Sequence, residues 1–371
     1  MTKTRSILFG AIAALVVLGA VAGCQPEPEP IKIGVIFFDM EGEATKAGLN
    51  GMQLFVEEIN ERGGLRGQEV ELVVVESVPA DEELAFQALE EIEQTHHPLA
   101  YISFGDNVAV IVAEFAEEHE VVHIASYAVG DVTSGKEWVF RYHTSLQGYL
   151  GVAAFLFIAL EAEEVSFIYN TDVLFGPFMS TVTGEMLQNP TLDIEFNSFG
   201  NEDTDFREQI TKSLDSDFIF AYTTDSNQIH NLILQIRELG YQGNIVTMKP
   251  YKDPLNPDLP EFIGVYAGAS IIYKTDFLFA QDLRERYEEE YETTPFSFFS
   301  GYAAEGYDSI RLIAELLEDE ELTRENLKNV LLQGFSYDGT FGNLNILPGE
   351  RVIEIKLYPV QYVEGGLKYL Q

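Results

Sequence analysis

IKIGVIFFD, at residues 31–39, is a run of mainly apolar residues that ends at an aspartate. Apolar residues on both faces of so short a segment indicate a strand buried on both sides, as in a parallel sheet. NGMQLFVEEIN, at 50–60, then has helical spacing, and the glycines of ERGGLRG at 61–67 end it. A buried strand followed by an amphipathic helix predicts an α/β sheet.

The alternation of strands and helices continues along most of the chain. Further strands are predicted over 70–77, 99–105 and 121–126, with helices over 81–94 and 108–119. A second alternation places strands over 164–170, 192–200, 217–224 and 244–249 among helices over 151–162, 176–188, 205–214 and 227–240. Helices over 279–292, 303–318 and 323–334 and a β-rich end over 337–370 follow. This pattern predicts the α/β class, with two doubly wound parallel-sheet lobes.

HEVVH, at 119–123, has the H-E-x-x-H spacing of zinc peptidases, in which two histidines on one helix face hold the metal. The β-branched Val121 and Val122 instead predict a strand after His119, so the motif would cross a helix-to-strand turn and separate His119 from His123. The histidines of THH, at 95–97, are predicted to lie in a loop. We therefore expect no metal site, although HEVVH keeps an enzyme as a distant alternative.

The rest of the sequence offers no other catalytic or cofactor motif. It contains no P-loop, G-x-G-x-x-G, G-x-S-x-G or C-x-x-C pattern. The chain has 61 acidic against 22 basic residues, for a formal net charge of −39, which argues against a nucleic-acid partner. We expect a protein with no cofactor and no enzymatic activity.

The first 24 residues have the pattern of an export signal. The basic segment MTKTRS precedes an apolar run over 7–20, and VAGC at 21–24 resembles a bacterial lipobox. We expect residues 1–23 to be removed and Cys24, the only cysteine, to be lipidated, with 24–30 as a Pro/Glu tether. An ordinary signal peptide with an incidental cysteine is the alternative.

From residue 31 to 370 the chain resembles the type I periplasmic binding proteins, in particular their leucine/isoleucine/valine-binding branch. The resemblance implies two lobes joined by three crossovers, near 144, 275 and 338, with a ligand in the cleft. Lobe one would comprise 31–143 plus 276–337, and lobe two 144–275 plus 338–371. Four segments carry the resemblance: NGMQLFVEEINERGGLRGQEVELVVVES (50–77), DTDFREQITKSLDSDFIFAYTT (203–224), GYDSIRLIAELLE (306–318) and YDGTFGNLNI (337–346).

The family places its ligand beyond the carboxyl ends of the strands, as open parallel sheets do in general. Carried over residue by residue, its ligand-carboxylate position falls on Asp106 or Asn107, and its acidic ligand for the amino group falls on Lys249. The other positions implied for ligand contact are Thr45, Lys46, Tyr127, Ala128, Phe175, Thr223, Thr224 and Tyr302.

Two of these positions depart from the family pattern in charge. An ionised Asp106 would repel a ligand carboxylate, and Lys249 would repel an ammonium. A reversed ligand, a ligand of another class, or an ion pair between Asp106 and Lys249 across the cleft would each remove the conflict. We favour a ligand that is not a standard branched-chain amino acid.

The resemblance implies an extracytoplasmic lipoprotein that captures a small polar, amino-acid-like molecule and delivers it to an ABC importer. Its partners would be the ligand, the permease and, through the lipid on Cys24, a bacterial membrane facing the periplasm or the cell surface. The protein is expected to be monomeric. The alternative is a ligand-sensing receptor module that works with a separate signalling partner.

Overall fold

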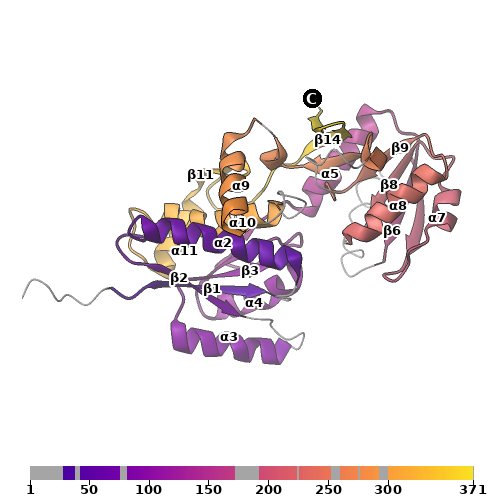
Figure 1. Cartoon of the computed structure of the whole chain (residues 1–371). Coiled ribbons are helices and arrows are strands. Elements are labelled where there is room, and N and C mark those ends of the chain that lie inside the picture. Colours follow the sequence, from indigo (N-terminus) through magenta and orange to yellow (C-terminus); the bar gives the residue numbers. More distant parts are fainter. Residues whose placement is uncertain are drawn as a thin grey trace, which may run out of the picture.

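The computed structural model describes residues 28–37, 42–75, 82–171, 192–223, 225–251, 260–274, 276–291 and 300–370. Its strands form two large sheets, each within its own lobe, and a separate two-stranded hairpin (Figure 1). The first sheet has the order β13-β5-β4-β3-β1-β2, and all its pairs are parallel. Its strands are β1 (Ile31–Phe37), β2 (Val70–Val75), β3 (Ala100–Phe104), β4 (Val122–Ser126), β5 (Val139–Tyr142) and β13 (Val352–Ile353).

Helices cover both faces of the first sheet, which explains why its strands are apolar throughout. Val35 of β1 packs in one core and its neighbour Ile36 in another on the opposite face. Side chains of successive strand residues point to opposite faces, so a strand buried on both sides needs apolar residues at consecutive positions. The helices of this lobe are α2 (Glu43–Glu61), α3 (Glu82–His96), α4 (Asp106–Glu118), α9 (Leu278–Tyr291), α10 (Ser300–Leu316) and α11 (Arg324–Gln333).

The second sheet has the order β15-β14-β10-β9-β8-β6-β7. Its first five strands in chain order are parallel, and β14 and β15 add an antiparallel edge. Its strands are β6 (Glu164–Asn170), β7 (Asp193–Phe199), β8 (Phe218–Tyr222), β9 (Asn244–Thr247), β10 (Tyr266–Ala269), β14 (Tyr358–Val363) and β15 (Gly366–Tyr369). Its helices are α5 (Leu146–Ala159), α7 (Arg207–Lys212), α8 (Ser226–Glu238), η2 (Pro260–Phe262) and η3 (Ile271–Tyr273). The predicted α/β class with two parallel-sheet lobes is confirmed.

The chain passes between the two sheets three times, over 142–146, 269–278 and 353–358. The last passage lies later than the position near 338 that the resemblance implied. Residues around 338 form a hairpin of β11 (Phe335–Gly339) and β12 (Gly342–Ile346), whose buried side chains pack in the core of the first lobe. β13 then pairs with β5 in the first sheet, so the chain leaves this lobe only after Ile353.

Helices α2 and α10 lie side by side above the first sheet and cross at small residues (Figure 1). A Cβ atom on Gly51 would overlap the carbonyl oxygen of Ala303, and one on Gly306 would overlap that of Gly48. Only glycine allows the two backbones to approach this closely. The crossing therefore sets the position of α10, which carries residues of the site described below.

The helix-to-strand turn predicted within HEVVH is confirmed. Helix α4 ends at Glu118, Glu120 has a left-handed φ of 50°, and β4 begins at Val122. His119 Nε2 lies 2.9 Å from Glu90 Oε1, whereas His123 Nε2 lies 2.8 Å from Ser103 Oγ. The two histidines thus have separate partners. In the part of the chain that the structure describes, no three metal-binding side chains gather into a site.

The prediction of a loop at THH was wrong for two of its three residues. Thr95 and His96 form the last turn of α3, and His97 follows it with a left-handed φ of 45°. His97 Nδ1 lies 2.8 Å from Glu93 Oε1, one helical turn back. The contact holds His97 against the last turn of the helix, which ends two residues later than the sequence pattern predicted.

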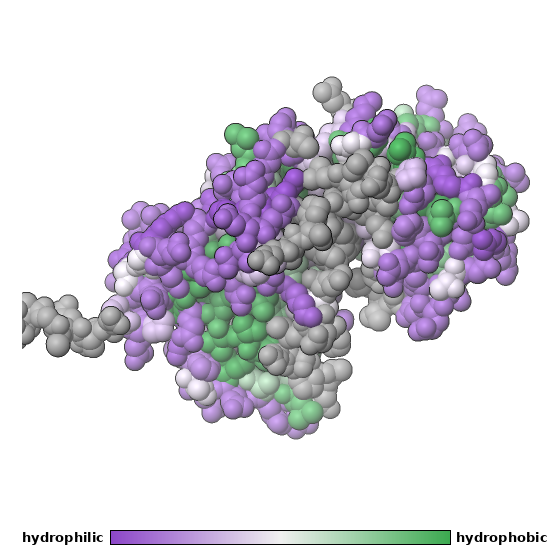
Figure 2. All heavy atoms as spheres, in the orientation of Figure 1, coloured by the Kyte–Doolittle hydropathy of each residue, from purple (hydrophilic) through white to green (hydrophobic). Residues whose placement is uncertain are grey.

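Hydrophilic residues cover most of the surface that Figure 2 shows, as the acidic composition implies. None of the helices among the described residues is long and apolar enough to span a membrane.

Candidate ligand-binding site

A cavity of about 70 Å³ lies where the two lobes meet. All three passages between the sheets contribute to its wall, so a change in the angle between the lobes would change its shape. In this conformation it has room for only a few water molecules. Its lining residues are Tyr127, His143, Thr144, Tyr149, Lys249, Pro250, Gly268, Ala269, Ser270, Tyr273, Gly301, Tyr302, Glu305, Phe341, Ile355 and Leu357.

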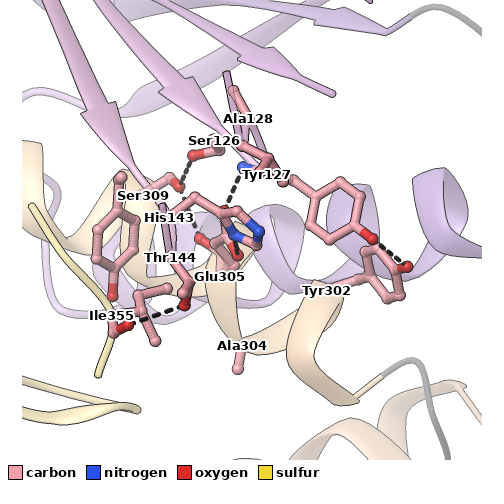
Figure 3. Close-up of polar contacts among 12 residues, drawn as sticks. Ser126, Tyr127, Ala128, His143, Thr144, Tyr302, Ala304, Glu305, Ser309 and Ile355 are labelled. Carbon is pink, nitrogen blue, oxygen red and sulfur yellow. Dashed lines mark hydrogen bonds and ion pairs between the residues drawn. The ribbon is translucent and has the colours of Figure 1, made fainter. Parts of the chain in front are cut away.

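Tyr127 follows β4 and is held in an uncommon backbone conformation. Its φ is 52°, in the left-handed region that a bulky residue rarely adopts. Its backbone N–H donates to the Glu305 carboxylate of α10 (Figure 3). Its ring stacks on Phe104 at 5.5 Å between centroids. Such a conformation costs about 1–3 kcal/mol and persists only where the surroundings impose it. Here it points the Tyr127 ring towards Tyr302 and the second lobe.

Glu305 is almost completely buried, and both of its oxygens are engaged within the site (Figure 3). One oxygen accepts from the Tyr127 N–H, and the other lies 2.9 Å from Nδ1 of His143, on the first passage. A buried carboxylate is stable only when it is paired and hydrogen-bonded. The two contacts of Glu305 therefore join α10 to the end of β5, through His143, and to the turn after β4, through Tyr127.

Lys249 follows β9 and reaches from the second lobe to two tyrosines of the first. Its Nζ donates to the hydroxyl of Tyr127 at 2.9 Å and to that of Tyr302 at 3.3 Å. The two hydroxyl oxygens lie 2.6 Å apart (Figure 3). Burial and the neighbouring Tyr302 hydroxyl raise the pKa of Tyr127 well above its ordinary value. Tyr127 therefore keeps its proton at neutral pH and remains a hydrogen-bond donor.

Three of the residues that the resemblance implied for ligand contact meet at this cavity: Tyr127, Lys249 and Tyr302. Phe175 and Thr224 lie outside the described residues. The implied residues that do not line the cavity are Thr45 and Lys46 in the first turn of α2, Asp106 and Asn107 at the start of α4, Ala128 after β4, and Thr223 after β8.

Asp106 has a role within its own lobe. Its Oδ1 accepts from the backbone N–H groups of Val129, at 2.9 Å, and Gly130, at 2.8 Å. These bonds fix the loop that carries Tyr127. Among the ion pairs of the described residues, none joins Asp106 to Lys249. The pairing across the cleft that the sequence left open is therefore not the arrangement seen here.

Glu305, His143 and Tyr149 line the cavity but were not predicted. One sequence signal did point to Glu305: it lies three residues after Tyr302 on a face of α10 that also carries the buried Asp308, and acids on an apolar helix face need a partner. His143 had no such signal, because the strand before it, β5, was not predicted.

Two α/β lobes, joined by three passages that all line one cavity, define a two-lobed binding protein for small molecules. The chain belongs to the periplasmic binding protein family, whose model matches residues 30–366. The family predicted from the sequence is thereby confirmed. No curated protein sequence matches the chain significantly.

Solved structures with the same fold cover nearly the whole chain. LivJ, a branched-chain amino acid transporter substrate-binding protein from Streptococcus pneumoniae solved with isoleucine, has a TM-score of 0.73 at 19% identity over 91% of this chain and 98% of its own. An ABC transporter substrate-binding protein from Desulfitobacterium hafniense with leucine has 0.72 at 23%, over 92% and 100%. A solute-binding protein from R. palustris with benzoate has 0.73 at 15%, over 92% and 95%. At these identities the similarity is one of fold.

Proposed function

We propose that this protein is an extracytoplasmic solute-binding protein that captures a small molecule in the cavity between its lobes and delivers it to an ABC importer. The observation that carries the proposal is the position of the cavity, which borders all three passages and receives side chains from both lobes. Structural neighbours that hold isoleucine, leucine or benzoate support a small-molecule ligand. The protein would work as a monomer and catalyse no reaction.

The three passages would act as hinges. Each is short, and hinge motion in two-lobed binding proteins is absorbed by a few residues between rigid elements. The link from Lys249 to Tyr127 and Tyr302 would break and reform as the lobes move. Closing the lobes over a ligand removes water from the cavity and strengthens its polar contacts.

A saturating ligand is expected to reduce the radius of gyration of the protein, because both lobes contact it and closing them makes the molecule more compact. Ligands would first be found by a thermal-shift screen of amino acids, amides, polyamines and small organic acids. At about 100 times its dissociation constant, a ligand that binds only the folded state adds about 2.7 kcal/mol of stability. Small-angle X-ray scattering with and without the hit then measures closure. A scattering profile that does not change at saturation would contradict the hinge mechanism.

Delivery to an importer is tested in cells. A strain that lacks the protein should lose uptake of the labelled ligand and regain it when the gene is restored. Normal uptake together with a lost transcriptional response to the ligand would instead identify a sensor.

We also propose that Cys24 carries the lipid that anchors the mature chain to the membrane. The lipobox-like VAGC segment, followed by the Pro/Glu tether, supports this assignment. Cys24→Ser is expected to shift the protein from the membrane fraction to the soluble fraction, or to leave the leader uncleaved. Fractionation followed by intact-mass measurement distinguishes the two results. If mature mass and membrane association both stay as in the unaltered protein, Cys24 is not the anchor.

A further inference from the structure

We infer that the cavity selects a compact carboxylate that lacks an α-ammonium group, and that Lys249, Tyr127 and Tyr302 hold the carboxylate. This inference rests on the proposed function and specifies the chemical class of its ligand. It follows from the hydrogen-bond donors that both lobes bring to one side of the cavity, from the contacts of the buried Glu305, and from the apolar remainder of the wall.

Three donors converge on one side of the cavity. The Lys249 ammonium lies 2.9 Å from the Tyr127 hydroxyl and 3.3 Å from the Tyr302 hydroxyl, which are 2.6 Å from each other. A carboxylate has two oxygens that accept several hydrogen bonds, and bonds to an ionised acceptor are about twice as strong as neutral ones. A carboxylate placed among these groups would replace hydroxyl oxygens as the acceptor of the Lys249 protons. Both tyrosines could then turn their own protons towards it.

The acid of the cavity is poorly placed to receive an ammonium group. Glu305 is 2% exposed, and its oxygens accept from the Tyr127 backbone and contact His143. A ligand ammonium would have to share oxygens that already hold the left-handed turn at Tyr127 and the buried His143. The other ionisable groups that line the cavity with Lys249 are His143 and tyrosines, at 127, 149, 273 and 302. A zwitterionic amino acid would therefore find three donors for its carboxylate but only a shared acid for its ammonium.

The rest of the cavity wall is mainly apolar and can contact the hydrocarbon part of a ligand. Phe341, Ile355 and Leu357 line the cavity together with Ala269 and Pro250. Ligand sites commonly combine such a wall with a few placed polar groups that fix orientation. Such a wall favours a ligand whose carboxylate is attached to a hydrocarbon group.

The net charge of the protein gives the inference a second, kinetic consequence. With a formal net charge of −39, the molecule repels an anion at long range even though Lys249 attracts it at short range. Salt screens the long-range part more than the buried contact. The association rate of a carboxylate should therefore rise with ionic strength, whereas that of a cation should fall.

Three compounds with matched shapes separate the charges: leucine, 4-methylpentanoate, which is leucine without its ammonium, and 3-methylbutylamine, which lacks the carboxylate. Benzoate adds a planar carboxylate. Calorimetry on the purified full chain should show that at least one of the two ammonium-free carboxylates binds roughly 10-fold or more tighter than leucine, since leucine must bury an ammonium beside an acid whose oxygens already have partners. The amine should not bind. Stopped-flow measurements should show the carboxylate associating faster as salt increases.

Single substitutions show which side chains hold the carboxylate. Lys249→Met is expected to weaken carboxylate binding roughly 100-fold, and Tyr302→Phe about 10-fold, because each removes a hydrogen-bond donor to a charged group. Lys212→Met is the control, since Lys212 is exposed on α7 and pairs with Glu208. Circular dichroism checks that each variant is folded.

Leucine binding as tight as that of both carboxylates, binding of the amine, or carboxylate affinity unchanged in Lys249→Met would each overturn the inference. The inference would also be overturned if none of the four compounds binds but a neutral molecule from the wider screen does. That result would leave the proposed function intact. The proposed function itself fails by a different result, namely that no compound of the wider screen stabilises the protein or closes its lobes.

Discussion

Replacing Asp308 with alanine is expected to lower the free energy of unfolding by about 3–5 kcal/mol. Asp308 is completely buried in α10, and burial raises the pKa of its carboxyl group. Its Oδ2 accepts from the Tyr142 hydroxyl at 2.8 Å and from the backbone N–H and hydroxyl of Thr340 at 2.8 and 2.7 Å, while Oδ1 accepts from Tyr337 at 2.9 Å. Alanine would leave three of these four donors buried without an acceptor, and the Thr340 hydroxyl would keep only the Ala304 carbonyl oxygen, at 3.4 Å. Urea denaturation at neutral pH, compared with the unaltered protein, measures the loss.

Two variants test that explanation. Asp338→Ala removes an acid from the β11–β12 hairpin, which carries Tyr337 and Thr340, but Asp338 is exposed, so we expect a change within about 0.5 kcal/mol. Asp308→Asn should cost less than Asp308→Ala, because an amide oxygen can replace Oδ2 and the amide N–H can donate to the Tyr337 oxygen. If alanine and asparagine cost the same, the loss comes from the negative charge that both variants lack, and not from packing or from hydrogen bonds that an amide oxygen can accept.

Asp308 also links the stability of the first lobe to the ligand-binding cavity. It ties α10 to Tyr142, the residue before His143, and to the hairpin that carries Phe341. Both His143 and Phe341 line the cavity. Weakening this anchor should therefore loosen the cavity wall as well as the first lobe, so Asp308→Ala should reduce ligand affinity although Asp308 does not line the cavity.

The long elements of the fold could be predicted because each has a clear period. Strands buried on both faces read as apolar runs, and their helices as 3.6-residue patterns, so β6 was predicted with its bounds over 164–170. The strands at the passages were missed. β5 and β10 have four residues and β13 has two, which is too short for a period, and Tyr266–Ala269 has two small side chains and a glycine. Pairing with a neighbouring strand, and not local pattern, makes these segments extended.

The site was predictable only in part, for a related reason. The family resemblance located Tyr127 and Lys249 at strand ends and Tyr302 just before the predicted helix over 303–318, and these three residues meet at the cavity. It could not show which side chains turn inward. Asp106 accepts hydrogen bonds from the N–H groups of Val129 and Gly130. The side chain of Tyr127 points to the cavity because its left-handed φ is held by Glu305, 178 residues away. Contacts over such distances along the chain leave no local sequence pattern.

The second large effect concerns His123, the second histidine of the HEVVH segment, and the pH dependence of stability. His123 is completely buried in β4, and burial lowers its pKa from 6.5 to about 3. Its Nε2 contacts Ser103 Oγ, and its Nδ1 is buried without a hydrogen-bond partner in the described structure. A proton added to the ring would therefore place a charge in the core of the first lobe with an unsatisfied N–H. The unfolded chain, in contrast, takes up this proton near pH 6.5.

Because the folded pKa is lower than the unfolded one, the unfolded state binds more protons, and the protein should lose stability as pH falls below about 6.5. Between pH 7 and pH 5 the expected loss from His123 is about 2 kcal/mol, at 1.36 kcal/mol per pH unit. Urea midpoints across this range should show that His123→Gln, which stays neutral and can still bond Ser103, flattens this slope. His119→Gln is the matched control, because His119 is partly exposed and lies beside Glu90. A slope that survives in His123→Gln but disappears in His119→Gln would place the acid-sensitive group at the surface of the lobe and not in its core.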